Sequence, residues 1–273
     1  MGKFVCFGEI MARLNPPGYL RLVQTQQLEI TYAGGEANVA VSLANFGKNA
    51  VFVTRLPDND LTKAAMRRLR GFGVDISRIA IGGDRMGIYF VEKGASQRAS
   101  KVLYDRKYSA IAQAQPSDFD WDGIFEETEW FHFTGITPAL SDNAAQICLE
   151  ACKKAKEKGI VVSCDLNYRN KLWTGSKAGT VMGELMEYVD VAIANEEDCE
   201  KVFEIKASGT DVTGGMLSKE GYGEVARTLA ERFSIPTVAI TLRGEISSND
   251  NHWAGMLYQK EKSYFSREYL IHN

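Results

Sequence analysis

Two short runs of the chain concentrate side chains that can do chemistry. The run 165–173 follows an apolar segment and carries a carboxylate, an amide, a guanidinium and an ammonium group. If that apolar segment is a strand of an open α/β sheet, these groups lie at its carboxyl end, where such sheets bind ligands. The run 34–38 joins two glycines, which let backbone approach a ligand closely, to the amide of Asn38. Together the runs predict a site for a polar, hydroxylated ligand, although two glycines also suit a plain helix start.

A tyrosine and an arginine sit two residues apart in a strand-like run. Side chains alternate across a strand, so Tyr104 and Arg106 share one face, and Tyr89 from the neighbouring strand-like run can join them. Arginine pairs carboxylates bidentately, and Arg169 supplies a second guanidinium. Two arginines at one site favour an acidic sugar over a neutral one. A solvated, charged edge strand is the alternative interpretation of this pattern.

Other polar groups follow other apolar runs. Glu9 ends the first one, where its carboxylate can meet sugar hydroxyls or simply belong to a turn. Asn195 and Asp198 follow a later run, at a position where acids are also favoured by the dipole of a helix N-terminus. Thr241 and Arg243 leave a further strand-like run and can contact phosphates there. Each of these signals is weak on its own.

The composition excludes several classes of protein. The chain has 273 residues, of which 25% are charged, and a formal net charge of −3, so nothing points to nucleic acid as a partner. No apolar stretch approaches the roughly 20 residues that span a bilayer, so no membrane association is expected. The five cysteines show no CxxC spacing, which predicts buried, reduced thiols in a cytoplasmic protein.

Short strand-like runs alternate with longer helical runs along most of the chain. We predict strands over 3–7, 50–54, 130–134, 160–165, 189–194 and 237–242. We predict helices over 36–46, 60–71, 142–158, 180–188 and 222–233, with Gly47 and Gly159 as helix stops. This alternation predicts an α/β fold with a doubly wound, mainly parallel sheet flanked by helices.

Two segments, 11–33 and 79–107, interrupt the alternation. The first predicts a hairpin-like excursion, and the second contains three consecutive strand-like runs, the first of them at 78–81. Strands with no helix between them cannot join a parallel sheet, so we expect a small antiparallel sheet. Beside the strand ends it would act as a lid; an edge insertion without function is the alternative. The chain is therefore predicted to be a single domain over 1–273 with this lid.

The runs at 34–38, 104–106 and 165–173 resemble those of the ribokinase-like (PfkB) carbohydrate kinases, and more narrowly the 2-keto-3-deoxygluconate kinases. The likeness extends along nearly the whole chain and implies a ribokinase-like fold and ATP-dependent phosphorylation of a sugar-acid hydroxyl, with Mg²⁺ on the nucleotide phosphates and no direct protein ligand to the metal. It implies that one group of residues binds the sugar acid: Gly34, Gly35, Asn38, Tyr89, Tyr104, Arg106 and Arg169. It implies that a second group contacts the nucleotide: Asn167, Asn195, Asp198, Thr241, Arg243 and Gly244. Glu36 and Asp198 depart from the family pattern, which has another small residue and a glutamate there.

The same resemblance implies a catalytic aspartate after a glycine-rich turn that would follow the strand-like run 269–271. The sequence reaches Asn273 first, so we expect no catalytic base within it, and impaired phosphoryl transfer if the chain ends there. Arg169 is expected to stabilise the transferring phosphoryl group, and the lids are expected to pair two subunits into a homodimer. The alternatives are a fructokinase-like or other sugar-acid kinase of this fold, and a non-catalytic chain that binds a sugar acid.

Overall fold

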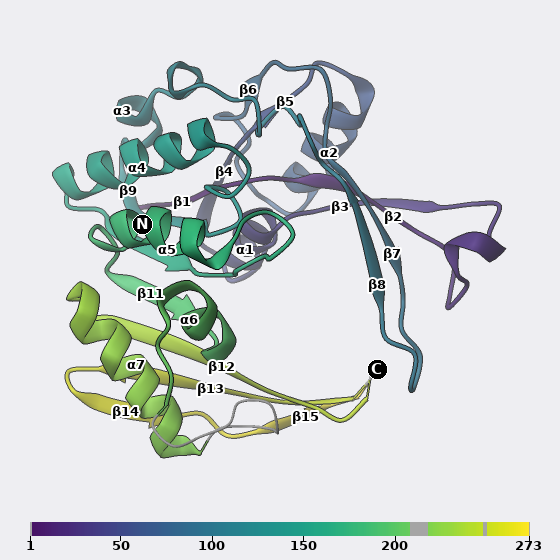
Figure 1. The fold of residues 1–273 in the computed structure, drawn as a ribbon. Helices are drawn as coiled ribbons and strands as arrows, with labels where there is room; N and C mark the ends of the chain where they lie inside the picture. The colour runs from purple at the N-terminus through teal and green to yellow at the C-terminus, as the bar shows by residue number, and fades with distance from the viewer. Residues whose placement is uncertain (1, 208–217, 248–249, 273) are drawn as a thin grey trace.

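The computed structural model describes residues 2–207, 218–247 and 250–272, and its core is a large, mainly parallel sheet (Figure 1). Within these residues nine strands form the sheet, in the order β14-β13-β12-β11-β10-β9-β1-β4, with β15 also paired to β13. The strands from β12 to β4 are parallel, and β13 to β15 add antiparallel pairs at one edge. Their bounds are β1 (Lys3–Phe7), β4 (Asn49–Val53), β9 (Thr128–Thr134), β10 (Val161–Asp165), β11 (Val191–Ala194), β12 (Thr237–Glu245), β13 (Asn251–Gln259), β14 (Lys262–Phe265) and β15 (Tyr269–Ile271). The predicted doubly wound sheet is confirmed.

Helices cover both faces of this sheet because its strands are apolar on both sides. Cys6 and Phe52 pack with α1 (Gly35–Asn45) and α2 (Asp60–Gly71) in one core cluster. Val5 and Phe7, on the other face of β1, pack in a second cluster with the remaining helices. These are α3 (Trp121–Ile124), α4 (Asp142–Glu157), α5 (Gly175–Met186), α6 (Glu196–Phe203) and α7 (Lys219–Phe233), besides the short 3-10 turns η1 (Leu22–Gln24) and η2 (Pro116–Asp118). Within the described ranges no helix is long and apolar enough to cross a membrane.

Helix boundaries follow the predicted signals at most ends. Gly47 and Gly159 follow α1 and α4 with φ of 75° and 69°, as expected of helix stops. The predicted start of α5 was wrong, because the helix begins five residues earlier, at Gly175. Glycines lower helix propensity, but a Cβ on Gly175 or Gly179 would lie 2.6 Å or 2.7 Å from a carbonyl oxygen of α6. Close packing of the two helices therefore overrides propensity.

The lid is a separate four-stranded sheet in the order β3-β2-β7-β8, which projects from the body of the molecule in Figure 1. Its strands are β2 (Met11–Asn15), β3 (Glu29–Ala33), β7 (Ile88–Glu92) and β8 (Lys101–Asp105). The outer pairs β2–β3 and β7–β8 are antiparallel, as expected. The central pair, β2–β7, is parallel, so the expectation of a purely antiparallel sheet was wrong. A parallel pair is possible here because α1, β4 and α2 connect the two strands.

The first of the three strand-like runs does not join the lid. It forms β6 (Ala80–Ile81), which pairs parallel with β5 (Arg55–Leu56) in a small sheet of its own. The helix α2 lies between β5 and β6, so these two strands form a crossover unit. The prediction failed because it considered only the strand-like runs after residue 79, and not the helix that precedes them.

A buried histidine in the core gives a prediction about stability and pH. His132 on β9 is 5% exposed, its Nδ1 lies 2.9 Å from Ser163 Oγ, and burial lowers its pKa to about 4. The folded chain thus keeps His132 neutral while the unfolded chain protonates it below its ordinary pKa of about 6.5. Stability from this group is present above about pH 6.5 and is lost, by up to about 3 kcal/mol, as pH falls toward 4. We expect the free energy of unfolding, measured by urea titration, to depend less on pH over this range in His132→Gln than in the parent chain. The same pH dependence in both chains would contradict this expectation.

Candidate active site

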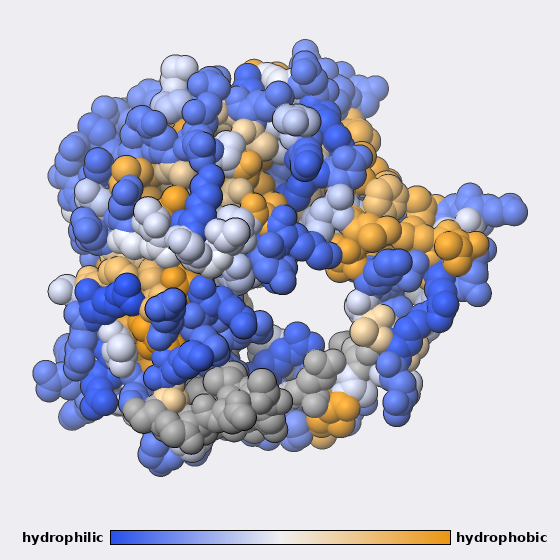
Figure 2. Space-filling view, in the orientation of Figure 1, coloured by the Kyte–Doolittle hydropathy of each residue, from blue (hydrophilic) through white to orange (hydrophobic). Residues whose placement is uncertain are grey.

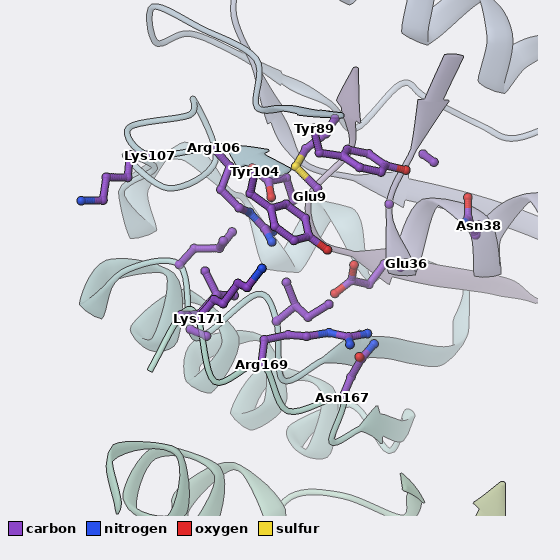
Figure 3. A pocket seen from close by; sticks show the side chains of 18 residues that line it. Glu9, Glu36, Asn38, Tyr89, Tyr104, Arg106, Lys107, Asn167, Arg169 and Lys171 are labelled. Carbon is purple, nitrogen blue, oxygen red and sulfur yellow. The ribbon is translucent and has the colours of Figure 1, made fainter. Parts of the chain in front are cut away.

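A cavity of about 470 Å³ lies between the lid and the carboxyl ends of the main strands. Residues of the lid line it, together with residues from the start of α1 and from the loop after β10 (Figure 3). The structure brings together at this cavity all seven residues expected to bind a sugar acid: Gly34, Gly35, Asn38, Tyr89, Tyr104, Arg106 and Arg169. Asn167, from the group expected at the nucleotide, lines it too. That these residues bind a sugar acid stays a prediction.

The lid contributes a pair of stacked aromatic rings. Tyr89 on β7 and Tyr104 on β8 are register partners, and their ring centroids lie 5.9 Å apart at 24° between planes. The guanidinium carbon of Arg106 lies 5.5 Å from the centre of the Tyr104 ring. The stack limits the motion of Tyr104, so its face is a fixed platform for cations.

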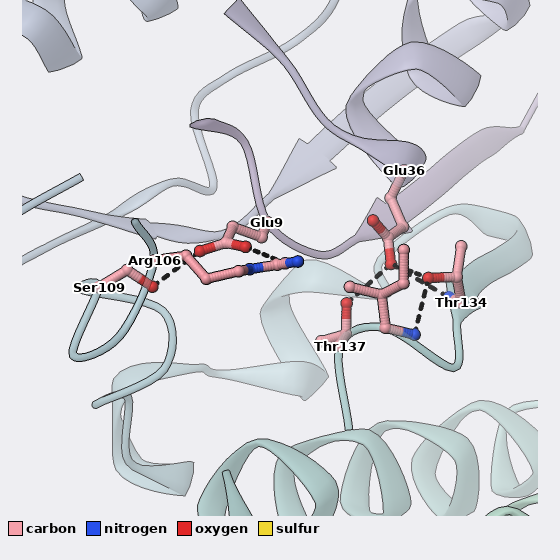
Figure 4. A network of polar contacts seen from close by, with 7 residues as sticks. Glu9, Glu36, Arg106, Ser109, Thr134 and Thr137 are labelled. Atoms are coloured by element: carbon pink, nitrogen blue, oxygen red, sulfur yellow. Dashed lines mark hydrogen bonds and ion pairs between the residues drawn. The ribbon is translucent and has the colours of Figure 1, made fainter. Parts of the chain in front are cut away.

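Arg106 is paired within the protein itself. Its guanidinium forms an ion pair with Glu9, and Ser109 Oγ donates a 2.7 Å hydrogen bond to the other carboxylate oxygen (Figure 4). The Glu9 side chain is only 2% exposed. Burial raises the pKa of Glu9, while the charge of Arg106 and the hydrogen bond from Ser109 oppose that rise. The positive charge of Arg106 is therefore balanced by Glu9, a pairing that sequence spacing did not reveal.

Two glycines make room for neighbouring protein groups. A Cβ on Gly34 would overlap the carbonyl oxygen of Glu9, and a Cβ on Gly8 would overlap the carboxylate of Glu36. Gly34 therefore lets the start of α1 pack directly on the end of β1. A Cβ on Gly35 would lie 3.5 Å from the methyl group of Thr134, an ordinary contact distance. The sequence pattern predicted that Gly34 lets the backbone approach a ligand, and it did not reveal this packing role.

Glu36, whose position departs from the family pattern, forms part of the cavity wall from the first turn of α1. Its side chain is buried, and one carboxylate oxygen accepts hydrogen bonds from the Thr134 amide (3.1 Å), the Thr134 hydroxyl (2.9 Å) and the Thr137 hydroxyl (2.7 Å) (Figure 4). Burial raises its pKa, and these hydrogen bonds oppose the rise. The carboxylate ties α1 to the end of β9. The sequence signal that could have pointed to this buried carboxylate is a glutamate directly after two glycines.

The loop after β10 has a defined conformation. Asn167 has φ of 37°, in the left-handed region that asparagine tolerates, and its backbone N–H donates to Asp165 Oδ1 at 3.2 Å. Leu166 and Trp173 are buried on either side of the exposed tip. In Figure 3 the guanidinium of Arg169 extends beside Asn167 toward Glu36.

Asn195 and Asp198, which were expected at the nucleotide, lie directly after β11 and outside the cavity lining. Asn195 caps α6, since its side-chain oxygen accepts from the Asp198 amide at 2.6 Å. Asp198 Oδ1 in turn accepts from the Tyr168 amide at 3.1 Å. Burial, then the charge of Asp165, raises the pKa of Asp198 to about 7; burial raises the pKa of Asp165 to about 6. Helix capping explains Asn195 by itself, and the charge of Arg169 only partly offsets the effect of burial on the pKa values of Asp165 and Asp198.

Residues 241–244 lie inside a strand, where the sequence predicted an exit from one. β12 continues to Glu245, and Thr241, Arg243 and Gly244 all have register partners on β13. The strand is longer than expected because pairing with β13 extends it. The Arg243 guanidinium donates to Asn251 Oδ1 at 3.0 Å and 3.1 Å. None of the three residues lines the cavity, and their contact with a nucleotide stays a prediction.

Comparison with known proteins agrees with this geometry. The model of the pfkB family carbohydrate kinases matches residues 1–242. The 2-dehydro-3-deoxygalactonokinase of Haloferax volcanii is 34% identical over 258 residues, which are 94% of this chain and 76% of that relative. The 2-dehydro-3-deoxygluconokinase of Thermoproteus tenax is 32% identical over 204 residues, 72% of this chain and 61% of the relative. The crystal structure of 2-dehydro-3-deoxygluconokinase from Thermotoga maritima superposes with a TM-score of 0.95 at 50% identity, covering 100% of this chain and 82% of that chain.

Proposed function

Because the chain belongs to the pfkB family of carbohydrate kinases, we propose that it transfers a phosphoryl group from ATP to 2-keto-3-deoxygluconate, which is the same compound as 2-dehydro-3-deoxygluconate. The expected ribokinase-like architecture and the expected class of enzyme, a phosphotransferase acting on a sugar hydroxyl, are confirmed. Two of the relatives described above carry this substrate in their names. The Haloferax relative carries the galacto epimer, which is the second candidate.

The chemistry of the cavity supports an acidic sugar. Two tyrosine hydroxyls and the amide of Asn38 suit sugar hydroxyls, and Arg106, Arg169 and Lys171 bring positive charge to the same space. A cavity of about 470 Å³ falls within the range of small-molecule sites. Cationic side chains at both the lid and the opposite loop are the observation that carries the proposal, because a neutral sugar needs none of them.

The acidic groups beside β10 and β11 fit a hydrated Mg²⁺ that is shared with nucleotide phosphates. Asp165 and Asp198 repel each other electrostatically, and a cation nearby would relieve that repulsion. Within the described residues no group of three or more His, Cys, Asp or Glu side chains forms a protein cage for a metal ion. The carboxylates of Asp165, Glu197 and Asp198 would hold the ion through water, and the ion would neutralise phosphate charge.

The side chains around the cavity position and shield the sugar rather than exchange protons with it. The two carboxylates that line it, Glu9 and Glu36, are engaged by Arg106 and by two threonines, so we assign neither as a general base. Lid strands over the opening would exclude water from the transferring group. We assign to Arg169, which lines the cavity from the loop tip, the role of balancing charge on that group.

Calorimetric titration of the chain with three sugars tests the proposal. We expect 2-keto-3-deoxygluconate or its galacto epimer to bind at least about tenfold more tightly than fructose, because one charge-assisted hydrogen bond contributes about 1.5–3 kcal/mol. The same titration with both acids ranks the two epimers. Tighter binding of fructose would overturn the proposal in favour of a fructokinase-like enzyme. ADP release from ATP and Mg²⁺ in the presence of the tighter-binding acid tests the transfer step.

The outer face of the lid supports a homodimer. One row of side chains crosses all four lid strands, Ile30-Leu14-Phe90-Leu103, on the face opposite Tyr89 and Tyr104. Ile30 is 48% exposed and Leu103 is 43% exposed, and Figure 2 shows apolar side chains gathered over the lid strands. Light scattering should give a dimer for the chain and a monomer for Leu103→Glu; a monomeric parent chain would overturn this.

The five buried, unpaired cysteines support the cytoplasm as the location of the protein, which cell fractionation can check.

A further inference from the structure

Four cationic side chains line the cavity, and they differ in how far their charges are already balanced. They are Arg106, Lys107, Arg169 and Lys171. Arg106 is ion-paired with Glu9, as described above. Arg169 lies toward Glu36 in Figure 3, and its charge acts to lower the pKa values of Asp165 and Asp198. The carboxylate of an incoming sugar acid therefore competes with Glu9 for Arg106. By contrast, Arg169 is coupled to Asp165 and Asp198 only through space and forms no ion pair within the described residues.

The two lysines differ in direction. In Figure 3 the amine of Lys107 points away from the side chains grouped at the cavity, whereas the amine of Lys171 points in among them toward Tyr104. Lys171 Nζ lies 6.0 Å from the centre of the Tyr104 ring, on the platform that also holds Arg106. Across the described parts of the chain, no carboxylate is within ion-pair distance of Lys171. Arg169 likewise has no ion-pair partner there, but its guanidinium extends toward Glu36, whereas the amine of Lys171 points toward the lid.

The loop holds Lys171 in this place. The amides of Leu172 and Trp173 donate to the carbonyl of Arg169 at 2.9 Å and 3.4 Å, which closes a turn around the lysine. The Tyr168 hydroxyl donates to the Trp173 carbonyl at 3.2 Å, and the Trp173 side chain is buried. The backbone of the loop is therefore ordered before a ligand arrives, which reduces the entropy lost on binding.

We propose that Lys171 is the residue that selects an acidic over a neutral sugar, by binding the substrate carboxylate between its amine and the Tyr104 hydroxyl. This inference rests on the proposed function and assigns it a specificity residue on the loop opposite the lid arginine. Because Glu9 balances its charge, Arg106 then contributes hydrogen-bond donors and part of the cavity wall to the sugar site, and little net positive charge. The contact also joins the loop to the lid, so a bound carboxylate draws the two sides of the cavity together.

Calorimetric titration of four chains with a charged and a neutral ligand tests this inference. The chains are the parent, Lys171→Met, Lys171→Arg and the matched control Lys107→Met; the ligands are 2-keto-3-deoxygluconate and its primary amide, which is neutral and nearly the same shape. We expect Lys171→Met to weaken binding of the acid by about 10- to 100-fold and binding of the amide by less than about threefold. Lys171→Arg should restore most of the affinity for the acid, and Lys107→Met should match the parent for both ligands. The dependence of acid affinity on salt concentration should fall only in Lys171→Met.

Each outcome separates the inference from the function on which it rests. A parent chain that binds neither ligand overturns the proposed function and the inference together. If the parent binds the acid and Lys171→Met binds it equally well, the function stands and the inference is wrong. An equal loss for acid and amide would mean that Lys171 acts by shape alone, and would also overturn it. Because Lys171 is exposed, circular dichroism should show parent-like folding for all four chains.

Discussion

Replacing Gly34 with alanine is expected to destabilise the chain by about 3 kcal/mol or more and to abolish detectable sugar binding. The added methyl group would overlap the backbone carbonyl of Glu9, which cannot rotate away as a flexible side chain would. Relieving the overlap must push α1 off the end of β1, and α1 carries Glu36 and Asn38 into the cavity. The φ of Gly34 is −165°, which any residue adopts, so the loss arises from space and not from backbone strain.

Gly35→Ala is the matched control, since the two glycines are adjacent and the substitution is the same. Its methyl group would meet only the side chain of Thr134, at 3.5 Å or more, and alanine is favoured over glycine within a helix. Urea unfolding of both variants measures the difference in stability, for which Gly35→Ala is the control, and calorimetric titration of Gly34→Ala with the sugar acid checks the loss of binding. The expectation fails if the two variants unfold within about 0.5 kcal/mol of each other.

Removing the Arg106 charge should destabilise the fold by about 3–5 kcal/mol, because it leaves Glu9 buried without its partner. Both side chains are nearly inaccessible, at 10% and 2% exposure, so solvent screens the pair weakly. Since burial already raises the pKa of Glu9, ionisation of this carboxylate opposes folding above its unfolded pKa. The loss in Arg106→Met should therefore be larger at pH 8 than at about pH 5, because lower pH favours the neutral, protonated form of Glu9.

The double variant Glu9→Gln/Arg106→Met should recover most of the lost stability, because it removes the uncompensated charge. Arg85→Met serves as the control, since its ion pair with Asp105 at 2.9 Å lies at the surface and its loss should cost far less. Urea unfolding of the parent and the three variants at the two pH values gives the free energies to compare. Equal losses for Arg106→Met and Arg85→Met would contradict a buried, coupled pair.

Sequence patterns predicted the parallel sheet and its helices because each buried strand and each amphipathic helix carries its own local signal. The exact bounds of α2 and β1 were predicted this way. Errors arose where a distant segment decides the outcome. β12 is lengthened by its pairing with β13, and α5 starts at a glycine because α6 packs against it.

In the candidate site, too, local features were predicted and contacts between distant segments were not. Chain position and residue type predicted which side chains gather at the cavity, because strand ends and alternation are local properties. They did not predict that Glu9 is bound by Arg106 and Ser109, which lie 97 residues and 100 residues from it in the chain. Charge balance depends on such pairs, so the sequence predicted Arg106 and Arg169 at the site without showing that Arg106 is paired, and it did not assign Lys171 to the site.

The parallel pairing of β2 with β7 determines how this lid can be exchanged between proteins. Each half of the sheet is a hairpin from a different part of the chain, and the central hydrogen bonds join two halves that α1, β4 and α2 separate in the sequence. A chimaera that transplants residues 79–107 alone would carry over one hairpin and leave it beside a foreign neighbour. Swapping the specificity of such lids therefore requires the transfer of both segments at once.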